Sequence, residues 1–195
     1  MVQIPTSTIL NYWLLDLGHE KWFQSSPETD RDICSRFSTA YEKARKIATR
    51  RLEDMDLQTG NDYLAAIILF DQFPRNMFRG LAQSFETDPL ARRLSHMAIE
   101  LGFDIAAPLD RRIFFYLPFE HGEEMENQNL AVSLVRERCA ESNYLEYAEL
   151  HRDIIARFGR FPHRNVILGR TSTPQELDYL ANGGKTFGAV PPAGK

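Results

Sequence analysis

The sequence predicts an all-α fold, and three observations lead to that prediction. Most of the chain repeats apolar residues at the three- and four-residue spacing of one helix face. Runs of alternating apolar and polar residues bounded by hairpin turns, the pattern of a half-buried strand, are not found. Proline and glycine recur where helices begin and end. We therefore expect about seven to eight helices, joined by short loops and stacked as antiparallel hairpins.

The N-terminal part of the chain shows two amphipathic patterns. Thr6 or Ser7 can cap a first helix that stops at Gly18. A second helix is expected from near Pro27 to about Leu52. The first should bury Ile9, Leu10, Trp13 and Leu17, and the second should bury a stripe of Ile33, Phe37, Tyr41, Ala44 and Ala48.

Residues 62–73 (DYLAAIILFDQF) are apolar nearly all round. A helix with that pattern lies in the middle of a molecule rather than on its surface. Pro74 is expected to end it, because proline lacks the N–H that a helix interior needs.

The next part of the chain shows repeated start and stop signals. Caps, prolines and glycines divide it into segments of helical length. The expected helices run from Asp88-Pro89 to Gly102, over residues 110–117 (DRRIFFYL) before Pro118, from the acidic stretch 120–128 (EHGEEMENQ) to about Ala140, and from a cap at Ser142 or Asn143 to Phe158, with Gly159 as the stop.

The C-terminal end combines one clear helix start with a segment that has little to bury. Residues 173–176 (TPQE) hold a capping box and a first-turn proline, so a last helix should run to about Ala181. The glycine-rich remainder lacks apolar side chains for a core. We expect a single helical domain over residues 1–182 and a flexible tail over residues 183–195.

Composition excludes several classes of function. With 195 residues and a net charge of −4, the chain suits one domain and lacks the broad positive surface of a nucleic-acid binder. No apolar run is long enough to span a bilayer, and the N-terminal sequence lacks the basic leader of a signal peptide. Two cysteines, Cys34 and Cys139, fit reduced core residues. These features predict a cytoplasmic protein that binds neither membrane nor nucleic acid.

Three segments place polar side chains beside aromatic residues and a proline. They are residues 70–76 (FDQFPRN), 116–124 (YLPFEHGEE) and 151–165 (HRDIIARFGRFPHRN). Buried polar groups cost free energy unless they are paired, so such clusters either satisfy one another or await a ligand.

The third segment reverses the acidic balance of the chain. Between His151 and Arg170 there are five arginines and two histidines against one acid, Asp153. Such a cluster raises the local potential where a carboxylate or phosphate can dock. The alternative is that the arginines pair with Asp71, Glu120, Glu123 and Glu124 and only lock helices together. For the first hypothesis the anion-holding side chains are Arg75, Arg160 and Arg164, with Asn76 and Asn165 as further polar ligand-binding groups.

Acid–base chemistry is the catalysis that these residue types suit best. His121, His151 and His163 titrate near neutral pH, and Glu120 or Asp71 can orient one of them. No His-x-x-x-His or Glu-x-x-His pair is present, and the nearby arginines oppose a cation, so neither a metal nor a cofactor is expected. Covalent catalysis is least favoured, because Cys139 belongs to an apolar helix.

The motifs LFDQFPRNMFRG, FFYLPFEHGEE and HRDIIARFGRFPHRNVILGRTSTPQELDYL resemble the bacterial family known as domain of unknown function 924. The resemblance covers nearly the whole chain up to about Leu180. It implies an all-helical, tetratricopeptide-like fold, whose superfamily members usually bind peptides along a concave face. It implies no reaction.

Two hypotheses about function therefore stand side by side. In the first, the three segments form one pocket that binds a small anionic metabolite and acts on it by general acid–base chemistry. In the second, stacked helices present a groove to a peptide or partner protein, and the polar clusters are purely structural. A homodimer that uses the arginine-rich segment as its interface is a third arrangement. The sequence leaves open whether the protein is an enzyme.

Overall fold

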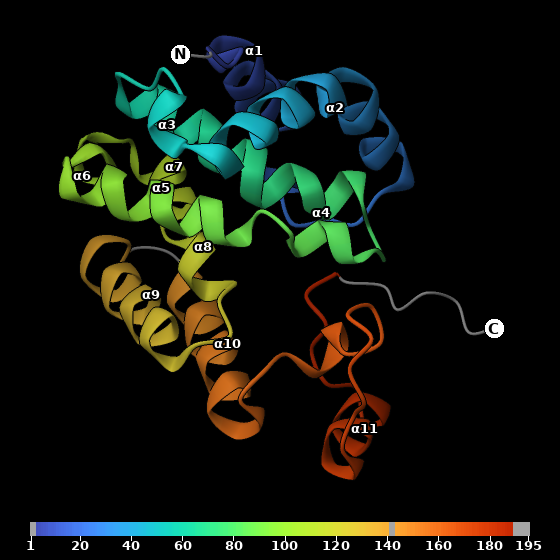
Figure 1. The fold of residues 1–195 in the computed structure, drawn as a ribbon. Coiled ribbons are helices and arrows are strands. Elements are labelled where there is room, and N and C mark those ends of the chain that lie inside the picture. Colours follow the sequence, from blue (N-terminus) through green and yellow to red (C-terminus); the bar gives the residue numbers. More distant parts are fainter. Residues whose placement is uncertain (1–2, 141–142, 189–195) are drawn as a thin grey trace.

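The computed structural model describes residues 3–140 and 143–188, and within them it contains helices and no strand (Figure 1). Counted as continuous runs, the helices of eight or more residues in these two ranges number seven. The all-α prediction is thereby confirmed. None of the helices in this part of the chain is both long and apolar enough to cross a membrane.

The first helical run begins one residue earlier than a threonine cap would place it. α1 (Thr6–Asn11) continues into a π turn over Tyr12–Leu17 and ends at Gly18, which has φ 76°. Pro5 precedes the helix, and the Thr6 side chain donates to Asp62 Oδ1 at 2.7 Å instead of capping. The prediction that Thr6 caps the helix was wrong, because its hydroxyl binds Asp62, a residue distant in the sequence, instead.

α2 (Pro27–Arg50) is the longest helix, and the predicted stripe is correct. Its N-cap is Ser26, whose hydroxyl accepts from the Thr29 backbone N–H. Its buried residues are Ile33, Phe37, Tyr41, Ala44 and Ala48.

The central helix passes through Pro74. α3 (Gly60–Ile67), a π turn over Ile68–Gln72 and α4 (Phe73–Met77) form one continuous run, in which residues 63–74 are all buried. The prediction that Pro74 ends the helix was wrong. The wide π turn precedes the proline ring, and the Phe70 carbonyl, which loses its N–H donor to proline, accepts from Thr87 Oγ1 at 2.6 Å.

α5 (Asp88–Glu100) starts and stops at the predicted residues, but Asp88 does not cap it. Thr87 precedes the helix without a capping bond, and the Asp88 carboxylate pairs with Arg75. Gly102, with φ 73°, closes the helix as expected. Shorter segments follow in order: α6 (Phe103–Ala106), α7 (Leu109–Arg112), a 3-10 turn over Ile113–Phe115, and α8 (Leu117–Glu120), which contains Pro118 in its first turn.

α9 (Met125–Arg138) and α10 (Tyr144–Phe158) pack side by side as an antiparallel hairpin. Asn143 precedes α10 without a side-chain cap, whereas Ser142 lies outside the described residues. Gly159, with φ 69°, ends α10 as predicted. The last helix, α11 (Pro174–Ala181), has the predicted capping box between Thr173 and Glu176.

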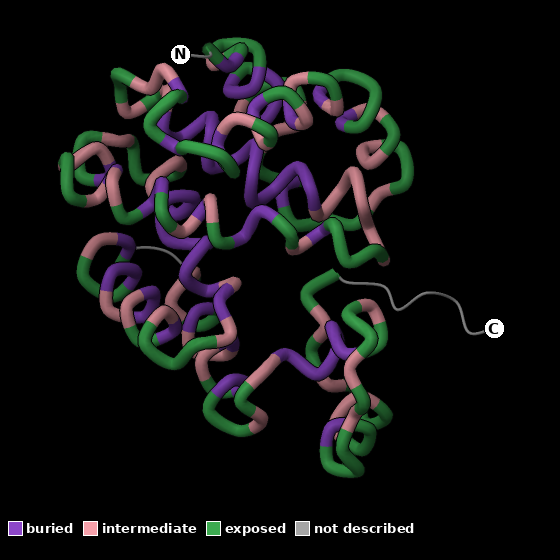
Figure 2. The backbone as a smooth tube through the Cα atoms, in the orientation of Figure 1, coloured by how far each residue is buried: buried purple, intermediate pink, exposed green. Residues whose placement is uncertain are grey.

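The main core surrounds the central helix, which is the most continuously buried element in Figure 2. Two tryptophans contribute to it, and the Trp22 indole N–H donates to the Trp13 carbonyl at 2.7 Å. A second, smaller cluster of Ile154, Ile155 and Phe161 lies at the end of α10. The described part of the expected tail, residues 183–188, follows α11 and returns toward α4 (Figure 1).

Thr87→Val should destabilise the protein by about 1 to 2 kcal/mol, because the buried Phe70 carbonyl loses its replacement donor. Urea unfolding followed by circular dichroism measures the loss. Thr39→Val on the exposed side of α2 is the control and should change stability by less than about 0.5 kcal/mol. Equal effects of the two substitutions would show that the Thr87 bond does not support the central helix.

Candidate functional site

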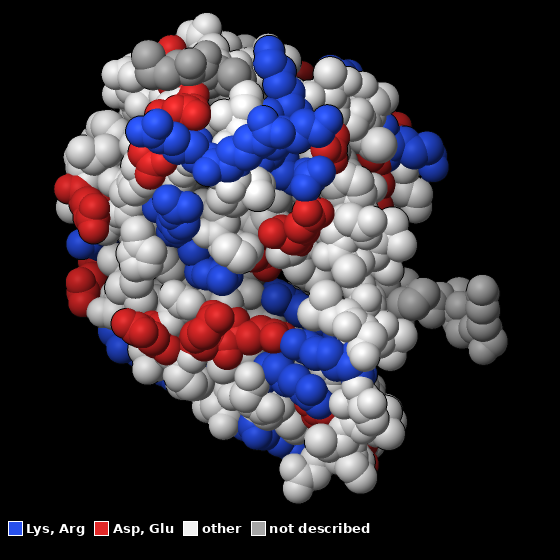
Figure 3. Space-filling model, viewed as in Figure 1, with Lys and Arg blue, Asp and Glu red and all other residues white. Residues whose placement is uncertain are grey.

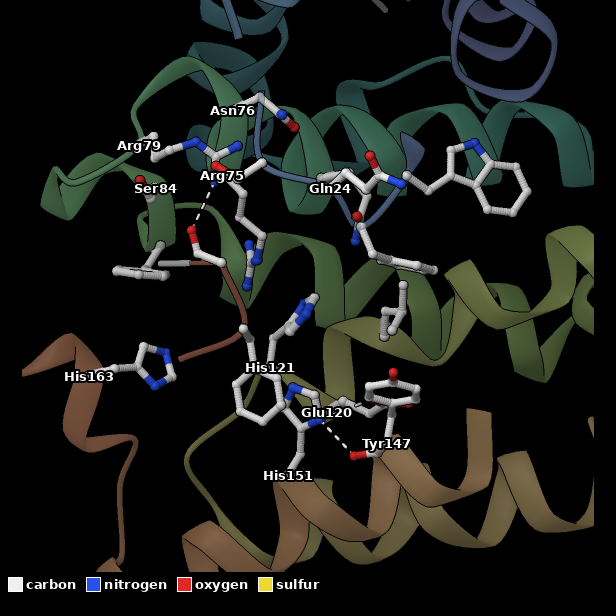
Figure 4. A pocket seen from close by; sticks show the side chains of 18 of the residues that line it. Gln24, Arg75, Asn76, Arg79, Ser84, Glu120, His121, Tyr147, His151 and His163 are labelled. Atoms are coloured by element: carbon white, nitrogen blue, oxygen red, sulfur yellow. Dashed lines mark hydrogen bonds and ion pairs between the residues drawn. The ribbon is translucent and has the colours of Figure 1, made fainter. Parts of the chain in front are cut away.

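The three polar segments meet at one cavity of about 430 Å³. They reach it from α4, from the end of α8, from α10 and from the 3-10 turn at Pro162–Arg164 (Figure 4). The predicted site residues that line it are Arg75, Asn76, Glu120, His121, His151, His163 and Arg164.

Three predicted residues lie outside the lining. Asp71 is completely buried behind His121. Arg160 pairs with Glu176 at the start of α11, with Nε to Oε1 at 2.7 Å. The Asn165 side chain is used between Ser172 and Arg170, so it holds the loop after α10 rather than the cavity wall.

Asp71 and His121 form the most closely coupled pair of the site. The distance from His121 Nδ1 to Asp71 Oδ1 is 2.7 Å, and Gln72 donates to the other carboxylate oxygen. Burial alone would raise the pKa of Asp71, but the charge that His121 carries at the low pH where Asp71 titrates, the charge of Arg75 and these hydrogen bonds outweigh burial and hold that pKa at about 2. Asp71 is therefore ionised.

His121 is a neutral imidazole with a defined proton position. Burial, followed by the charge of Arg75, lowers the pKa of His121, against the opposing effect of Asp71. A neutral ring beside a carboxylate donates its Nδ1–H, which leaves Nε2 with a free lone pair. This is the arrangement of an oriented general base.

Arg75 is already neutralised by protein groups. Its guanidinium makes two bonds to the Asp88 carboxylate, at 2.9 and 3.2 Å, and donates to the Asp71 backbone carbonyl at 2.6 Å. Arg79 is held in the same way by Asp30, at 2.6 and 2.8 Å, and Asn76 donates to that carboxylate too. On the face seen in Figure 3, basic and acidic side chains lie next to one another. Arg75 and Arg79 are therefore paired with carboxylates of the protein itself.

Arg164 differs from the other cavity arginines. Its guanidinium carbon lies 4.5 Å from the Phe85 ring centroid and 4.4 Å from that of Phe161, a sandwich of cation–π contacts. Nη1 donates to the His121 carbonyl at 3.0 Å, while its distance of 3.8 Å to Asp88 is too long for a hydrogen bond. Nε is buried without a hydrogen-bond partner among the described residues. Burial lowers the pKa of Arg164 to about 10, which still leaves it charged at neutral pH.

Glu120 is the protonated acid of the site. Its side chain is buried, and burial together with the nearby Asp71 charge raises its pKa to about 8. Oε1 has no hydrogen-bond partner in the described part of the chain, and Oε2 lies 3.6 Å from His151 Nδ1. Gln128 fixes the local backbone by donating to the carbonyls of Glu120 and Gly122. A neutral carboxyl in this position can donate a proton or a hydrogen bond.

His151 and His163 are both neutral, because burial lowers the pKa of each to about 3. His151 Nδ1 lies 2.8 Å from the Tyr147 carbonyl, which fixes that nitrogen as the donor (Figure 4). His163 Nδ1 is buried, and no partner for it lies within the described residues.

Several lining residues were missed by sequence reasoning. Trp22, Phe23 and Phe85 line the cavity as apolar walls, although none of them belongs to the three polar segments. Phe187 also lines it, although its glycine-rich neighbours suggested a tail. The spacing of residues in the sequence did not indicate that the three aromatic residues or Phe187 line a cavity.

Metal and thiol chemistry find no support in the geometry. Among the described residues, no three His, Cys, Asp or Glu side chains are grouped as metal ligands. Cys139 is buried at the end of α9, outside the cavity lining, and burial raises the pKa of its thiol.

Fold and site together define an all-helical protein with one polar cavity assembled from several helices and the 3-10 turn at Pro162–Arg164. The chain belongs to the family described as bacterial protein of unknown function (DUF924), whose model matches residues 9–184. It is similar to the solved structure of a protein of unknown function, ATU0120, from Agrobacterium tumefaciens, with a TM-score of 0.82 and 43% identity over 91% of this chain and 97% of that chain. A comparison with curated proteins gave no match. The family resemblance is confirmed.

Glu120→Gln should flatten the pH dependence of stability. The folded protein retains the Glu120 proton up to a pH of about 8, whereas the unfolded chain releases it near its usual pKa of 4.5. Wild-type stability should therefore fall relative to the variant as pH rises from about 5 to about 8, by at most about 1.4 kcal/mol per unit. Urea unfolding at several pH values checks this, with exposed Glu100→Gln as the control. Parallel wild-type and Glu120→Gln profiles would contradict it.

At pH 7, His121 should be a neutral ring with the proton on Nδ1. Nitrogen-15 NMR of labelled histidines reports both properties, and the His121 signals are assigned by their loss in His121→Gln. Asp71→Asn should lower the pKa of His121 further, because the carboxylate is what favours the charged ring. Asp153→Asn, on exposed α10 surface, is the control and should not move those signals. A proton found on Nε2 would exclude the general-base assignment.

Proposed function

We propose that the cavity binds a small anionic molecule and that Arg164 is its anion-binding group. The observation that carries the proposal is the position of this arginine: charged, held between two phenylalanine rings on the cavity wall, and without a carboxylate at hydrogen-bond distance. Burying a charged side chain costs free energy unless a group of opposite charge or a hydrogen-bond acceptor pairs with it. Planar guanidinium geometry matches carboxylate and phosphate oxygens.

The size and lining of the cavity fit a small molecule. About 430 Å³ lies within the usual range of roughly 300 to 1,000 Å³ for such sites. Aromatic and aliphatic side chains from Trp22, Phe23, Leu117 and Tyr147 line it together with the polar groups. The ligand we propose therefore has an anionic end and an apolar body.

General acid–base chemistry is the second part of the proposal. Asp71 orients His121, whose Nε2 accepts a proton, and protonated Glu120 supplies one. The two carboxyl groups have pKa values moved in opposite directions by their surroundings, to about 2 for Asp71 and about 8 for Glu120. Such a separation is how one site holds a base and an acid at the same pH.

Binding of a peptide or partner protein is the alternative. A groove protein carries its exposed polar and aromatic residues along helix faces, whereas here side chains from α4, the end of α8, the middle of α10 and the 3-10 turn at Pro162–Arg164 converge on one cavity. That convergence favours the small-ligand proposal. A homodimer through the arginine-rich segment stays a prediction, and sedimentation tests it.

Arg164→Gln should abolish the thermal shift produced by carboxylated or phosphorylated metabolites, because selective binding to the folded state must raise the melting midpoint. A ligand at about 100 times its Kd stabilises the wild type by about 2.7 kcal/mol, a readily measured shift. Arg160→Gln is the matched control from the same segment, since Arg160 pairs with Glu176 outside the cavity.

The variants separate the proposals clearly. A ligand-induced shift retained in Arg160→Gln and lost in Arg164→Gln supports the cavity site. A shift retained in both would remove Arg164 from anion binding. No shift with any small anion would favour the partner-protein alternative.

A further inference from the structure

The segment that follows α11 is fastened at its start. We call residues 183–188 the strap. Gly184 lies against the Tyr179 ring so closely that a Cβ there would be 2.4 to 2.6 Å from three ring carbons. The next residue, Lys185, donates its backbone N–H to Tyr179 Oη at 2.9 Å. Glycine is therefore required at residue 184 for this path.

The strap then enters the cavity. The Phe187 ring stacks on His151, with centroids 3.7 Å apart and planes inclined by 16°. It also lies within 5.8 Å of the His163 ring and 6.1 Å of the Phe161 ring. Both Phe187 and Gly188 line the cavity, so the strap occupies part of the space assigned to the ligand.

The far end of the strap is bound by the opposite wall. The Gly188 carbonyl accepts from Arg79 Nη1 at 3.0 Å. The other two guanidinium nitrogens of Arg79 are used by Asp30. A neutral carbonyl oxygen thus accepts from Nη1, the guanidinium nitrogen that the Asp30 pair does not use.

The backbone at Phe187 is strained. Its φ of 50° is positive, unlike that of every other non-glycine residue in the described part of the chain. A side chain rarely adopts this conformation, and it persists only where the surroundings determine it. Here the stack on His151 and the bond from Arg79 provide that support. Strain of this kind favours release once either contact is replaced.

We infer that the strap occupies the place of the ligand, and that a planar aromatic ring carrying an anionic group displaces it. The ring of such a molecule would stack on His151 where Phe187 now lies, and its anionic oxygens would meet Arg79 and Arg164. The aromatic part of the inference comes from the strap contacts, while the anionic part rests on the proposed function. An aryl phosphate or aryl carboxylate has both features.

Phe187→Ala in the full chain tests the inference, with Leu177→Ala as the control. Leu177 is an exposed apolar side chain on nearby α11. The first measurement needs no ligand: the His151 ring protons should move downfield in Phe187→Ala, because the stacked ring that shields them is gone, and should stay in place in Leu177→Ala.

The second measurement is binding of phenyl phosphate and of inorganic phosphate. Phenyl phosphate should bind about tenfold more tightly to Phe187→Ala than to wild type, the gain expected if the strap leaves the cavity in roughly one wild-type molecule in ten. Inorganic phosphate lacks a ring to stack on His151 and gains only access to Arg79, so Phe187→Ala should improve its binding less than that of phenyl phosphate. Arg164→Gln should weaken both anions.

The outcomes distinguish this inference from the proposed function. Arg164-dependent binding with the same phenyl phosphate affinity in wild type, Phe187→Ala and Leu177→Ala would overturn the strap inference and leave the anion site intact. Unmoved His151 protons in Phe187→Ala would also overturn it. Failure of both anions to bind any of the proteins, with the His151 shift present, would overturn the proposed function and the ligand class named here.

Discussion

The carbonyl of Phe70 lacks the usual helical donor four residues later, because residue 74 is a proline, and the hydroxyl of Thr87 donates to it instead. This substitution allows the central helix to continue into α4 through a widened turn. The continuity matters for the site, since the same turn buries Asp71 behind His121 and the residues just after it carry Arg75 and Arg79 to the cavity. A helix that stopped before Pro74 would leave these groups on a loop.

Burial then decides the charge state of almost every group around the cavity. Asp71 stays ionised because the Arg75 guanidinium lies 3.5 Å from its carboxylate. Glu120 lacks such a partner and keeps its proton, while His151 and His163 remain uncharged. Arg164 is charged because a guanidinium holds its proton even at a pKa of about 10. It lies against two aromatic faces, and its nearest carboxylate, that of Asp88, is 3.8 Å away, whereas its paired neighbours have carboxylates at hydrogen-bond distance.

Local sequence rules predicted those parts of the fold that depend on local chemistry. The buried stripe of α2 follows from helical periodicity, and the capping box at Thr173 and the stop at Gly159 follow from helix-end geometry. Predictions failed where a distant residue competes for the same group. Asp88 could cap its own helix, but Arg75, thirteen residues earlier, takes its carboxylate. Thr6 is drawn to Asp62 in the same way.

The candidate site shows the same division. The three polar segments each combine polar side chains with aromatic residues and a proline. That common composition was enough to expect that they meet, and they do line one cavity. Residue type alone could not distinguish Arg160 from Arg164, which follows four residues later, because the two arginines differ only in their partners in the folded protein. Phe187 gave no signal, since a single aromatic residue among glycines has no periodicity to interpret.

The position of Gly188 makes different parts of the described chain unequal as points of attachment. The described chain begins beside α1 (Figure 1), whereas its last described residue, Gly188, is bound to Arg79 on the cavity wall. A fluorophore attached within the strap therefore adds bulk at the cavity, where the strap has to move. The same fluorophore on exposed Thr39 of α2 leaves the strap unchanged, so the choice of attachment point is itself a variable in any binding assay on this protein.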